Sequence, residues 1–138
     1  MRIMAIDYGD AHTGIAISDP TGFLAGFTTT INAYRPEVVA DQVASLAREH
    51  SVEELVLGYP KNMDGSLGPR AEKAQAMGEL LKEVTGLPLT LWDERRTTID
   101  AHQILMGAGK NAKKRKKTVD AVAATLILEG YLTYKKSR

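Results

Sequence analysis

Three carboxylate residues occur at positions where the packing of a core does not require them. Asp7 and Glu94 each follow a short apolar stretch with the composition of a buried strand, and Asp120 lies in the first turn of a predicted helix. In an open α/β sheet, the carboxyl ends of the strands line the functional crevice. If the two strands are neighbours and point the same way, Asp7 and Glu94 meet there. The small Ala123 and Ala124 allow the helix to approach the sheet, which would bring Asp120 to the same rim.

This set of side chains suits a hard divalent cation. Clustered carboxylates repel one another and desolvation disfavours their charged form, but a bound cation offsets both effects. The chain has no cysteine, and its 3 histidines have no metal-ligand spacing, so oxygen ligands for Mg²⁺ or Mn²⁺ are expected rather than a Zn²⁺ site. Two such ions about 3.5–4 Å apart can activate a water and stabilise the leaving oxygen of a phosphodiester. We therefore predict that Asp7, Glu94 and Asp120 are catalytic residues and ligands of one or two metal ions.

Each acid has a structural interpretation when it is taken singly. Asp7 precedes a glycine, as turn residues often do. Asp120 is early in a helix, where the macrodipole favours an acid, and Glu94 could pair with Arg95 or Arg96. The prediction of an active site therefore depends on the three acids occurring together.

The net charge of +1 conceals an uneven distribution of charge. Residues 1–109 carry 9 basic and 15 acidic side chains, whereas residues 110–138 carry 9 basic and 2 acidic ones. Six of the eight residues in Lys110–Lys117 are cationic, just before Asp120. This segment can be interpreted as a solvated loop or as a nuclear-localisation signal. A basic flap beside an acidic metal site favours a nucleic acid as the partner, because cations hold phosphates while metal ions assist cleavage.

Further polar side chains lie on predicted loops and helix starts near these acids. Some of them follow the fourth predicted strand, and others follow Glu94. One lies at the start of the second predicted helix, where free backbone N–H groups favour anions. Thr97 is also expected to cap a helix. Together with the basic segment, the candidate substrate-binding residues are Lys61, Asn62, Arg70, Arg95, Thr97, Thr98, Lys113, Lys114, Arg115, Lys116 and Lys117.

The rest of the sequence supplies the elements that would position these residues. Hydrophobic periodicity and turn signals predict the order βββαβαβαα, a five-stranded mixed sheet flanked by helices in one α/β domain over residues 1–138. The predicted strands are 2–6, 13–18, 25–31, 54–58 and 87–92, and the predicted helices are 36–50, 69–85, 97–106 and 118–132, with a loop over 107–117. The length excludes a two-lobed enzyme, and the absence of cysteine excludes disulfides and a cysteine nucleophile.

Several motifs occur in an order that resembles one known family. They are Asp7-Tyr8-Gly9 with Gly14-Ile15-Ala16-Ile17-Ser18-Asp19, Gly58-Tyr59-Pro60 with Asp64-Gly65, Trp92-Asp93-Glu94-Arg95 with Thr97-Thr98, and Lys116-Lys117-Thr118-Val119-Asp120 with Ala123-Ala124. From Met1 to about Leu132, the chain resembles the YqgF family, also called RuvX, of bacterial pre-16S rRNA nucleases. The resemblance implies an RNase H-like fold related to the RuvC resolvases, a role in maturing the 5′ end of 16S rRNA, and Asp7, Glu94 and Asp120 as the catalytic acids.

The sequence departs from the family pattern close to the predicted site. Ala11 and His12 stand where many relatives have a basic residue, and no second acid closely follows Asp120. A fourth carboxylate, as in the RuvC enzymes, would have to come from Asp93 or Asp10.

The expected function is that of a metal-dependent endonuclease that matures pre-16S rRNA during ribosome biogenesis, with Mg²⁺ or Mn²⁺ as cofactor and precursor rRNA or ribosomal particles as partners. Resolution of Holliday junctions in DNA is an alternative, and it requires a matched pair of active sites. A non-catalytic, RNA-binding assembly factor is a second alternative. A sugar-kinase or actin-like ATPase is a third, against which the short chain and the missing P-loop argue.

The state and location of the protein follow from weaker signals. We expect a monomer or a weak homodimer. The apolar run at the amino terminus is too short for a signal peptide, and no stretch is long enough to span a membrane. With the family resemblance, this predicts the bacterial cytoplasm and no membrane partner.

Overall fold

The centre of the molecule is a five-stranded mixed sheet. The computed structural model describes residues 1–20, 25–59, 68–93 and 112–136, without the side chains of 112–121 and 136. The strands are β1 (Ile3–Asp7), β2 (His12–Ser18), β3 (Ala25–Asn32), β4 (Glu54–Tyr59) and β5 (Leu89–Asp93). Their order in the sheet is β3-β2-β1-β4-β5, with β1, β4 and β5 parallel and β2 antiparallel to both of its neighbours. The predicted strand count, mixed sheet and opening hairpin are confirmed.

Asp7 and Glu94 were expected to meet if their two strands were neighbours and pointed the same way, and only the second part of this condition holds. The strands β1 and β5 point the same way, but they are not neighbours, because β4 lies between them. Neighbouring strands are about 4.8 Å apart, so β1 and β5 are separated by roughly 10 Å. Side chains at their carboxyl ends must therefore bridge the width of β4.

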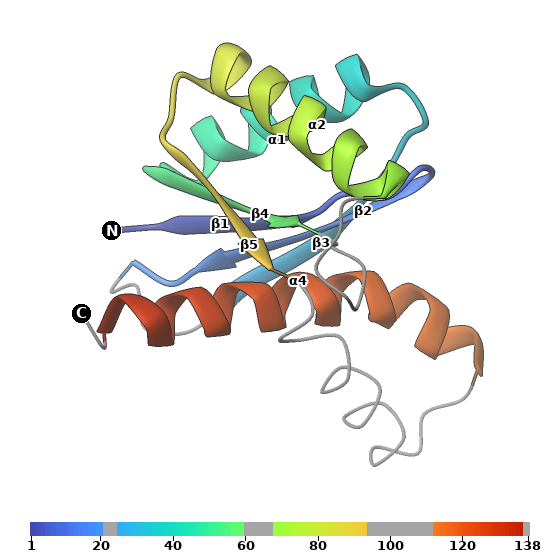
Figure 1. Cartoon of the computed structure of the whole chain (residues 1–138). Helices are drawn as coiled ribbons and strands as arrows, with labels where there is room; N and C mark the ends of the chain where they lie inside the picture. Colours follow the sequence, from blue (N-terminus) through green and yellow to red (C-terminus); the bar gives the residue numbers. More distant parts are fainter. Residues whose placement is uncertain (21–24, 60–67, 94–111, 137–138) are drawn as a thin grey trace.

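Two helices cover one face of the sheet and a long helix covers the other (Figure 1). On the first face lie α1 (Pro36–Glu49) and α2 (Pro69–Thr85), each with a proline in its first turn, where the missing N–H costs no hydrogen bond. Gly86 ends α2 with φ of 69°, a left-handed conformation that favours glycine. On the second face lies α4 (Ala112–Lys136).

The strand β1 separates the two layers of the core by simple alternation. Met4 and Ile6 are fully buried in the cluster under α1 and α2. Ile3 and Ala5 belong to the other cluster, with Ala124 of α4. Successive strand residues face opposite sides of the sheet, so two separate cores can be built from one five-residue strand.

The helix α4 corrects the predicted loop. Residues 112–117 were expected to belong to a basic loop, but α4 begins at Ala112, so Lys113 to Lys117 lie in its first turns. Alanine, lysine and arginine are strong helix formers, and neither glycine nor proline interrupts the sequence from 112 to 129. Helical propensity therefore extends the packed helix backwards through the cationic run.

Polar contacts fix the carboxyl-terminal half of α4 across the start of two strands. The Tyr131 hydroxyl donates a hydrogen bond to the Glu54 carboxylate at the first residue of β4, and it lies 3.4 Å from Thr90 Oγ1 of β5. Lys135 forms an ion pair with the same Glu54 at 2.8 Å. Figure 1 shows that α4 runs opposite to the parallel strands, so its amino-terminal half points toward their carboxyl ends.

Smaller differences occur at element ends. The strand β5 begins at Leu89 rather than Leu87, because the Leu87 N–H donates to Thr85 Oγ1 and Pro88 has no N–H. The predicted helix over 97–106 lies outside the described residues, as do residues 21 and 22 of the predicted turn and most of the loop over 59–68. Within the described residues, no helix is long and apolar enough to cross a membrane.

Candidate functional site

Asp7 ends β1 on the face that α4 covers. The alternation that puts Ile3 and Ala5 under α4 also assigns Asp7 to that face. Its side chain is partly exposed, in contrast to the four buried residues that precede it. The sheet therefore presents one carboxylate at the carboxyl end of its central strand.

Glycines lie beside Asp7 on both neighbouring strands. Gly14 of β2 is its direct cross-strand partner. On β4, the register Ile6–Leu57 brings Gly58 level with Asp7, and the burial of Val56 under α4 assigns Gly58 to the same face. The residues of β2 and β4 that lie level with Asp7 therefore contribute no side chain to this face.

The end of β5 lies at the same level of the sheet. Gly58 pairs with Trp92, which packs against the cluster under α4 with its ring edge-on to Tyr131. Asp93 pairs with Tyr59 one step further, and alternation assigns it to the opposite face, with Leu91. Asp93 is thus not available to Asp7 as a fourth carboxylate on the α4 face. Glu94 lies outside the described residues.

The backbone of Asp120 lies toward the same edge of the sheet. Asp120 is one helical turn before Ala124, which is fully buried against Ala5 and Ala16. The rise from Asp120 to Tyr131 is about 16 Å, and β4 has nearly the same length, about 16 Å from Glu54 to Tyr59. Because Tyr131 sits at the start of β4, position 120 comes level with the carboxyl ends of the strands. The side chain of Asp120 is not described.

The other proposed source of a fourth carboxylate is engaged elsewhere. Asp10, in the turn after β1, forms an ion pair with Lys73 of α2 at 3.0 Å. It lines a cavity of about 310 Å³ with Tyr8 and Tyr34, on the side of α1 and α2. Burial raises the pKa of the Tyr8 phenol, and the nearby Asp10 carboxylate raises it further. Asp10 therefore belongs to the opposite face from Asp7.

A histidine shares the face of Asp7. His12 begins β2, and alternation along Gly14 and Ala16, the latter buried under α4, assigns it to the α4 side. Its Nδ1 lies 2.6 Å from Oδ1 of Asn32, its cross-strand partner on β3. Asn32 was not among the predicted residues, because the register of β2 on β3, which no local motif announces, brings it there.

The predicted substrate-binding residues differ in how far the structure tests them. Arg70 is exposed in the first turn of α2, next to Ala71, which packs on Tyr59 at the end of β4. It therefore lies at the carboxyl edge of the sheet. For Lys113, Lys114, Arg115, Lys116 and Lys117, only the helical backbone is described. Outside the described residues lie Lys61, Asn62, Arg95, Thr97 and Thr98.

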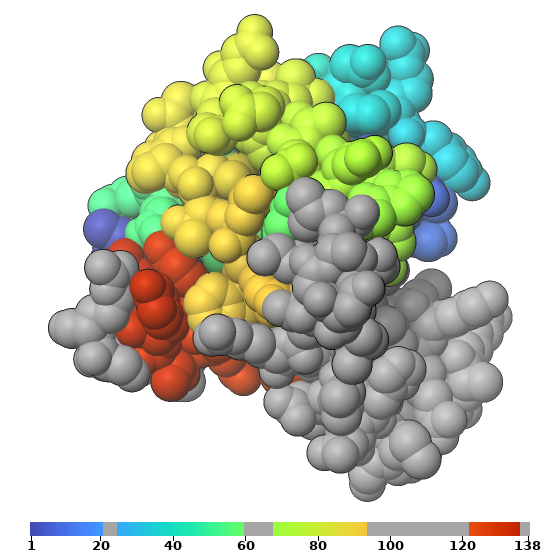
Figure 2. Space-filling view, in the orientation of Figure 1, coloured from blue at the N-terminus to red at the C-terminus, as the bar shows by residue number. Residues whose placement is uncertain are grey.

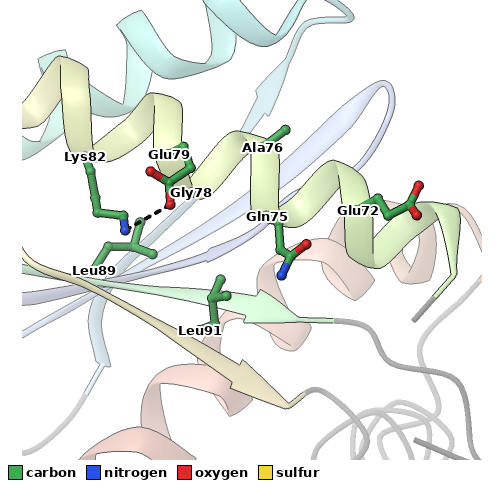
Figure 3. A pocket seen from close by; sticks show the side chains of 8 residues that line it. All are labelled: Glu72, Gln75, Ala76, Gly78, Glu79, Lys82, Leu89 and Leu91. Atoms are coloured by element: carbon green, nitrogen blue, oxygen red, sulfur yellow. Dashed lines mark ion pairs between the residues drawn. The ribbon is translucent and has the colours of Figure 1, made fainter. Parts of the chain in front are cut away.

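A second hollow lies between α2 and the edge strand β5 (Figure 3), two elements that adjoin on the surface of the molecule (Figure 2). It has a volume of about 630 Å³ and is lined by Leu89, Leu91 and polar side chains of α2. Two of these, Glu79 and Lys82, form an ion pair at 3.1 Å. With Glu72 also at its wall, this hollow has more acidic than basic groups and does not suit a phosphate chain.

The donor set at the carboxyl edge fits a hard cation, although the described residues do not by themselves form a metal site. Among the residues whose side chains are described, no group of three histidine, cysteine, aspartate or glutamate side chains is close enough to hold an ion. Asp7 offers carboxylate oxygens beside two glycines, and the two other predicted ligands are also carboxylates. Oxygen ligands of this kind suit Mg²⁺ or Mn²⁺.

A five-stranded mixed sheet of this order, with an acid at the end of its first strand and helices on both faces, defines an RNase H-like α/β protein. The family model described as "RuvX: Holliday junction resolvase" matches residues 1–134. The chain therefore belongs to the RuvX family.

Known proteins agree with this assignment. A protein of Halothermothrix orenii named "Putative pre-16S rRNA nuclease" is 46% identical over 134 residues, which cover 97% of this chain and 96% of that protein. The family description and this name both indicate a nuclease, an enzyme that hydrolyses phosphodiester bonds.

Solved structures show the same fold. RuvC of Thermus thermophilus, in complex with a Holliday junction substrate, has a TM-score of 0.67 at 14% identity, covering 99% of this chain and 96% of that one. A ROK hexokinase from the same organism reaches a TM-score of 0.52, but the match covers only 38% of the kinase. At 21% identity, this partial match shows a likeness of fold alone.

Proposed function

We propose that this protein is a metal-dependent endonuclease that matures the 5′ end of pre-16S rRNA in the bacterial cytoplasm, during ribosome biogenesis. The observation that carries the proposal is the position of Asp7. It ends the central strand, faces α4, and has glycines rather than side chains beside it on both neighbouring strands. The name of the relative from Halothermothrix orenii supports pre-16S rRNA as the substrate.

The catalytic group in this proposal consists of Asp7, Glu94 and Asp120, which would hold one or two Mg²⁺ or Mn²⁺ ions. Three separate elements contribute them, and the rise of α4 supports a position of Asp120 level with Asp7. Glu94 follows directly after Asp93, the last residue of β5, in the sequence. When bound, the metal would supply Lewis-acid activation of a water and charge stabilisation of the leaving oxygen.

The chain's own residues would orient the nucleic acid around this group. The cations Lys113, Lys114, Arg115, Lys116 and Lys117 are on the same helix as Asp120, one to two turns before it. Lysine and arginine neutralise phosphates without regard to sequence. Arg70, at the start of α2, is proposed as a second phosphate contact. Further proposed contacts come from the segments after β4 and β5: Lys61, Asn62, Arg95, Thr97 and Thr98.

The decisive experiment compares the wild-type protein with Glu94→Gln on precursor rRNA and on a four-way DNA junction, at low salt, with Mg²⁺ or Mn²⁺ and with chelator. We expect metal-dependent cleavage of the precursor rRNA that is lost in the variant. Intact, salt-sensitive binding without cleavage under every condition would contradict a nuclease that acts alone, and it would favour a non-catalytic assembly factor or a nuclease that requires ribosomal particles.

Holliday-junction resolution is the second candidate, favoured by the description of the family and by the likeness of the fold to RuvC. A resolvase must make two matched cuts, so it acts as a symmetric pair. Sedimentation of the protein with and without the junction separates the two functions, since a strict monomer that leaves the junction uncut cannot be a resolvase. For the rRNA nuclease, a monomer or a weak homodimer suffices.

A further inference from the structure

A hydrogen bond between two strands fixes the orientation of the His12 ring. His12 and Asn32 are direct cross-strand partners at one end of the β2–β3 ladder, and Nδ1 of His12 lies 2.6 Å from Oδ1 of Asn32. Among the described residues, Asn32 is the hydrogen-bonding partner of the His12 imidazole. Both side chains are exposed, so the pair is not needed to satisfy buried groups.

The chemistry of this contact determines what the other ring nitrogen can do. An amide oxygen can only accept a hydrogen bond, so the contact with Oδ1 of Asn32 selects the tautomer in which Nδ1 of His12 carries the proton. In the neutral imidazole, Nε2 is then a hydrogen-bond acceptor. The two ring nitrogens point away from each other, so Nε2 is directed away from Asn32.

The same ring stands close to the proposed catalytic edge. His12 lies two residues before Gly14, the direct partner of Asp7, and on the same face of the sheet. It is therefore the diagonal neighbour of Asp7, at roughly 7–8 Å between backbones for such a pair. Gly9 keeps the connection compact, because a Cβ at this position would collide with the carbonyl oxygen of His12.

We propose that His12 is a substrate-contacting residue: in the tautomer that the Asn32 contact selects, its Nε2 accepts a hydrogen bond from a ribose 2′-hydroxyl of the bound strand, with Asn32 as its positioning residue. The inference rests on the proposed nuclease function and specifies its substrate class as RNA. Phosphate oxygens at neutral pH are acceptors and cannot satisfy an acceptor nitrogen. In the sugar–phosphate backbone the 2′-hydroxyl is the donor, and DNA lacks it.

The test measures binding rather than cleavage. Wild-type protein, His12→Phe, His12→Gln and Asn32→Leu are titrated with single-stranded RNA, DNA and 2′-O-methyl RNA of one sequence, in the presence of chelator. We expect His12→Phe to weaken RNA binding about three- to tenfold, the value of one ordinary hydrogen bond. Its binding of DNA and of 2′-O-methyl RNA should be unchanged. His12→Gln, whose side chain retains an acceptor, should recover part of the loss.

Asn32→Leu tests the positioning role. It should weaken RNA binding less than His12→Phe does, and it should add nothing in the double variant, because both changes act through the same ring. Equal weakening of RNA and DNA by His12→Phe, or no weakening of either, would overturn the proposal. Thermal denaturation of each variant verifies that it is folded.

The two proposals fail in different ways. Loss of RNA selectivity in His12→Phe is measured without metal and without a cut, whereas the nuclease proposal fails when no metal-dependent cleavage occurs. If the protein binds RNA through His12 but never cleaves it, the inference about His12 stands and the proposed nuclease activity is contradicted.

Discussion

Gly14 lies directly opposite Asp7 in the β1–β2 ladder, so the carboxylate at the end of the central strand has no side chain facing it across that ladder. Gly58 continues the arrangement on β4, and α4 covers the same face. A side chain at either glycine position would lie directly beside this carboxylate.

Asp7→Asn tests the role of this carboxylate. The substitution keeps the size of the side chain but removes its charge, so cleavage of precursor rRNA should fall by about a hundredfold or more while the fold is retained. Single-turnover cleavage assays and urea denaturation measure the two effects. Asp10→Asn is the matched control, because its exposed carboxylate pairs with Lys73 on the other side of the sheet. Similar losses in both variants would show that Asp7 has no special role.

Metal affinity gives a second test of the same residue. In the absence of nucleic acid, titration calorimetry with Mn²⁺ should detect binding to the wild type and much weaker binding to Asp7→Asn, because one charged oxygen ligand is removed. Equal Mn²⁺ affinity in the two proteins would exclude Asp7 as a ligand.

The cations of α4 should strengthen the binding of nucleic acid regardless of its base sequence. Replacing Lys113, Lys114, Lys116 and Lys117 by glutamine should weaken RNA and DNA alike. The slope of log affinity against log salt should become shallower by about 0.7–0.9 for each phosphate that the variant no longer neutralises. Filter binding at several salt concentrations measures both.

The helix itself should survive this change. Cations in a first turn are unfavourable with the helix dipole, and glutamine is nearly as good a helix former as lysine. Circular dichroism should therefore show no loss of helix. Lys82→Gln on α2, which removes a cation paired with Glu79, is the control for a nonspecific charge effect.

The contribution of Tyr131 to the stability of the fold should decrease at alkaline pH. Burial and the hydrogen bond to Glu54 raise the pKa of the Tyr131 phenol above the ordinary 10.0. The folded protein therefore holds this proton more tightly than the unfolded chain. Its contribution is complete below pH 10.0 and is lost as the pH rises through the folded value.

Tyr131→Phe removes both the hydrogen bond and this titration. At neutral pH it should lower the free energy of unfolding by about 1.5–3 kcal/mol, the value of a hydrogen bond to a charged group. Above pH 10 the difference from wild type should shrink. Urea denaturation across this range measures it, with the exposed Tyr34→Phe as control. A constant difference at all pH values would contradict the assignment.

Gly9→Ala should destabilise the turn between β1 and β2. The added Cβ would meet the carbonyl oxygen of His12, which is backbone and cannot rotate away. A loss of about 1–3 kcal/mol is expected from such crowding. Gly130→Ala, whose Cβ would lie 3.2 Å from the Trp92 ring, provides a milder comparison in the same denaturation assay.

Local signals in the sequence were sufficient for most elements. Pro69 and Gly86 bound α2 at its predicted residues, because a proline in the first turn and a left-handed glycine after the last act within a few residues. The start of α4 could not be predicted in this way. The cations from Lys113 to Lys117 resemble a solvated loop in composition, although their intrinsic propensity is helical.

The candidate site was predictable as a set of residue types but not as an arrangement. Asp7 at a strand end follows from hydrophobic patterning, whereas the insertion of β4 between β1 and β5 depends on long-range pairing. The same holds for Asn32, which reaches His12 only through the register of β3. Partners that are set by strand order leave no periodic signal in the sequence.

The amino-terminal strand and α4 share one core, in which Ile3 and Ala5 are sealed by Ala124, Ile127 and Leu128. During synthesis, the ribosome completes β1 more than a hundred residues before this seal exists. A nascent or prematurely terminated chain would therefore expose one whole face of its sheet, and it would also lack the acid and the cations that α4 carries. Completion of the fold and completion of the proposed cleavage machinery are thus the same event, and an unfinished copy of this protein would be unable to cut the RNA around it.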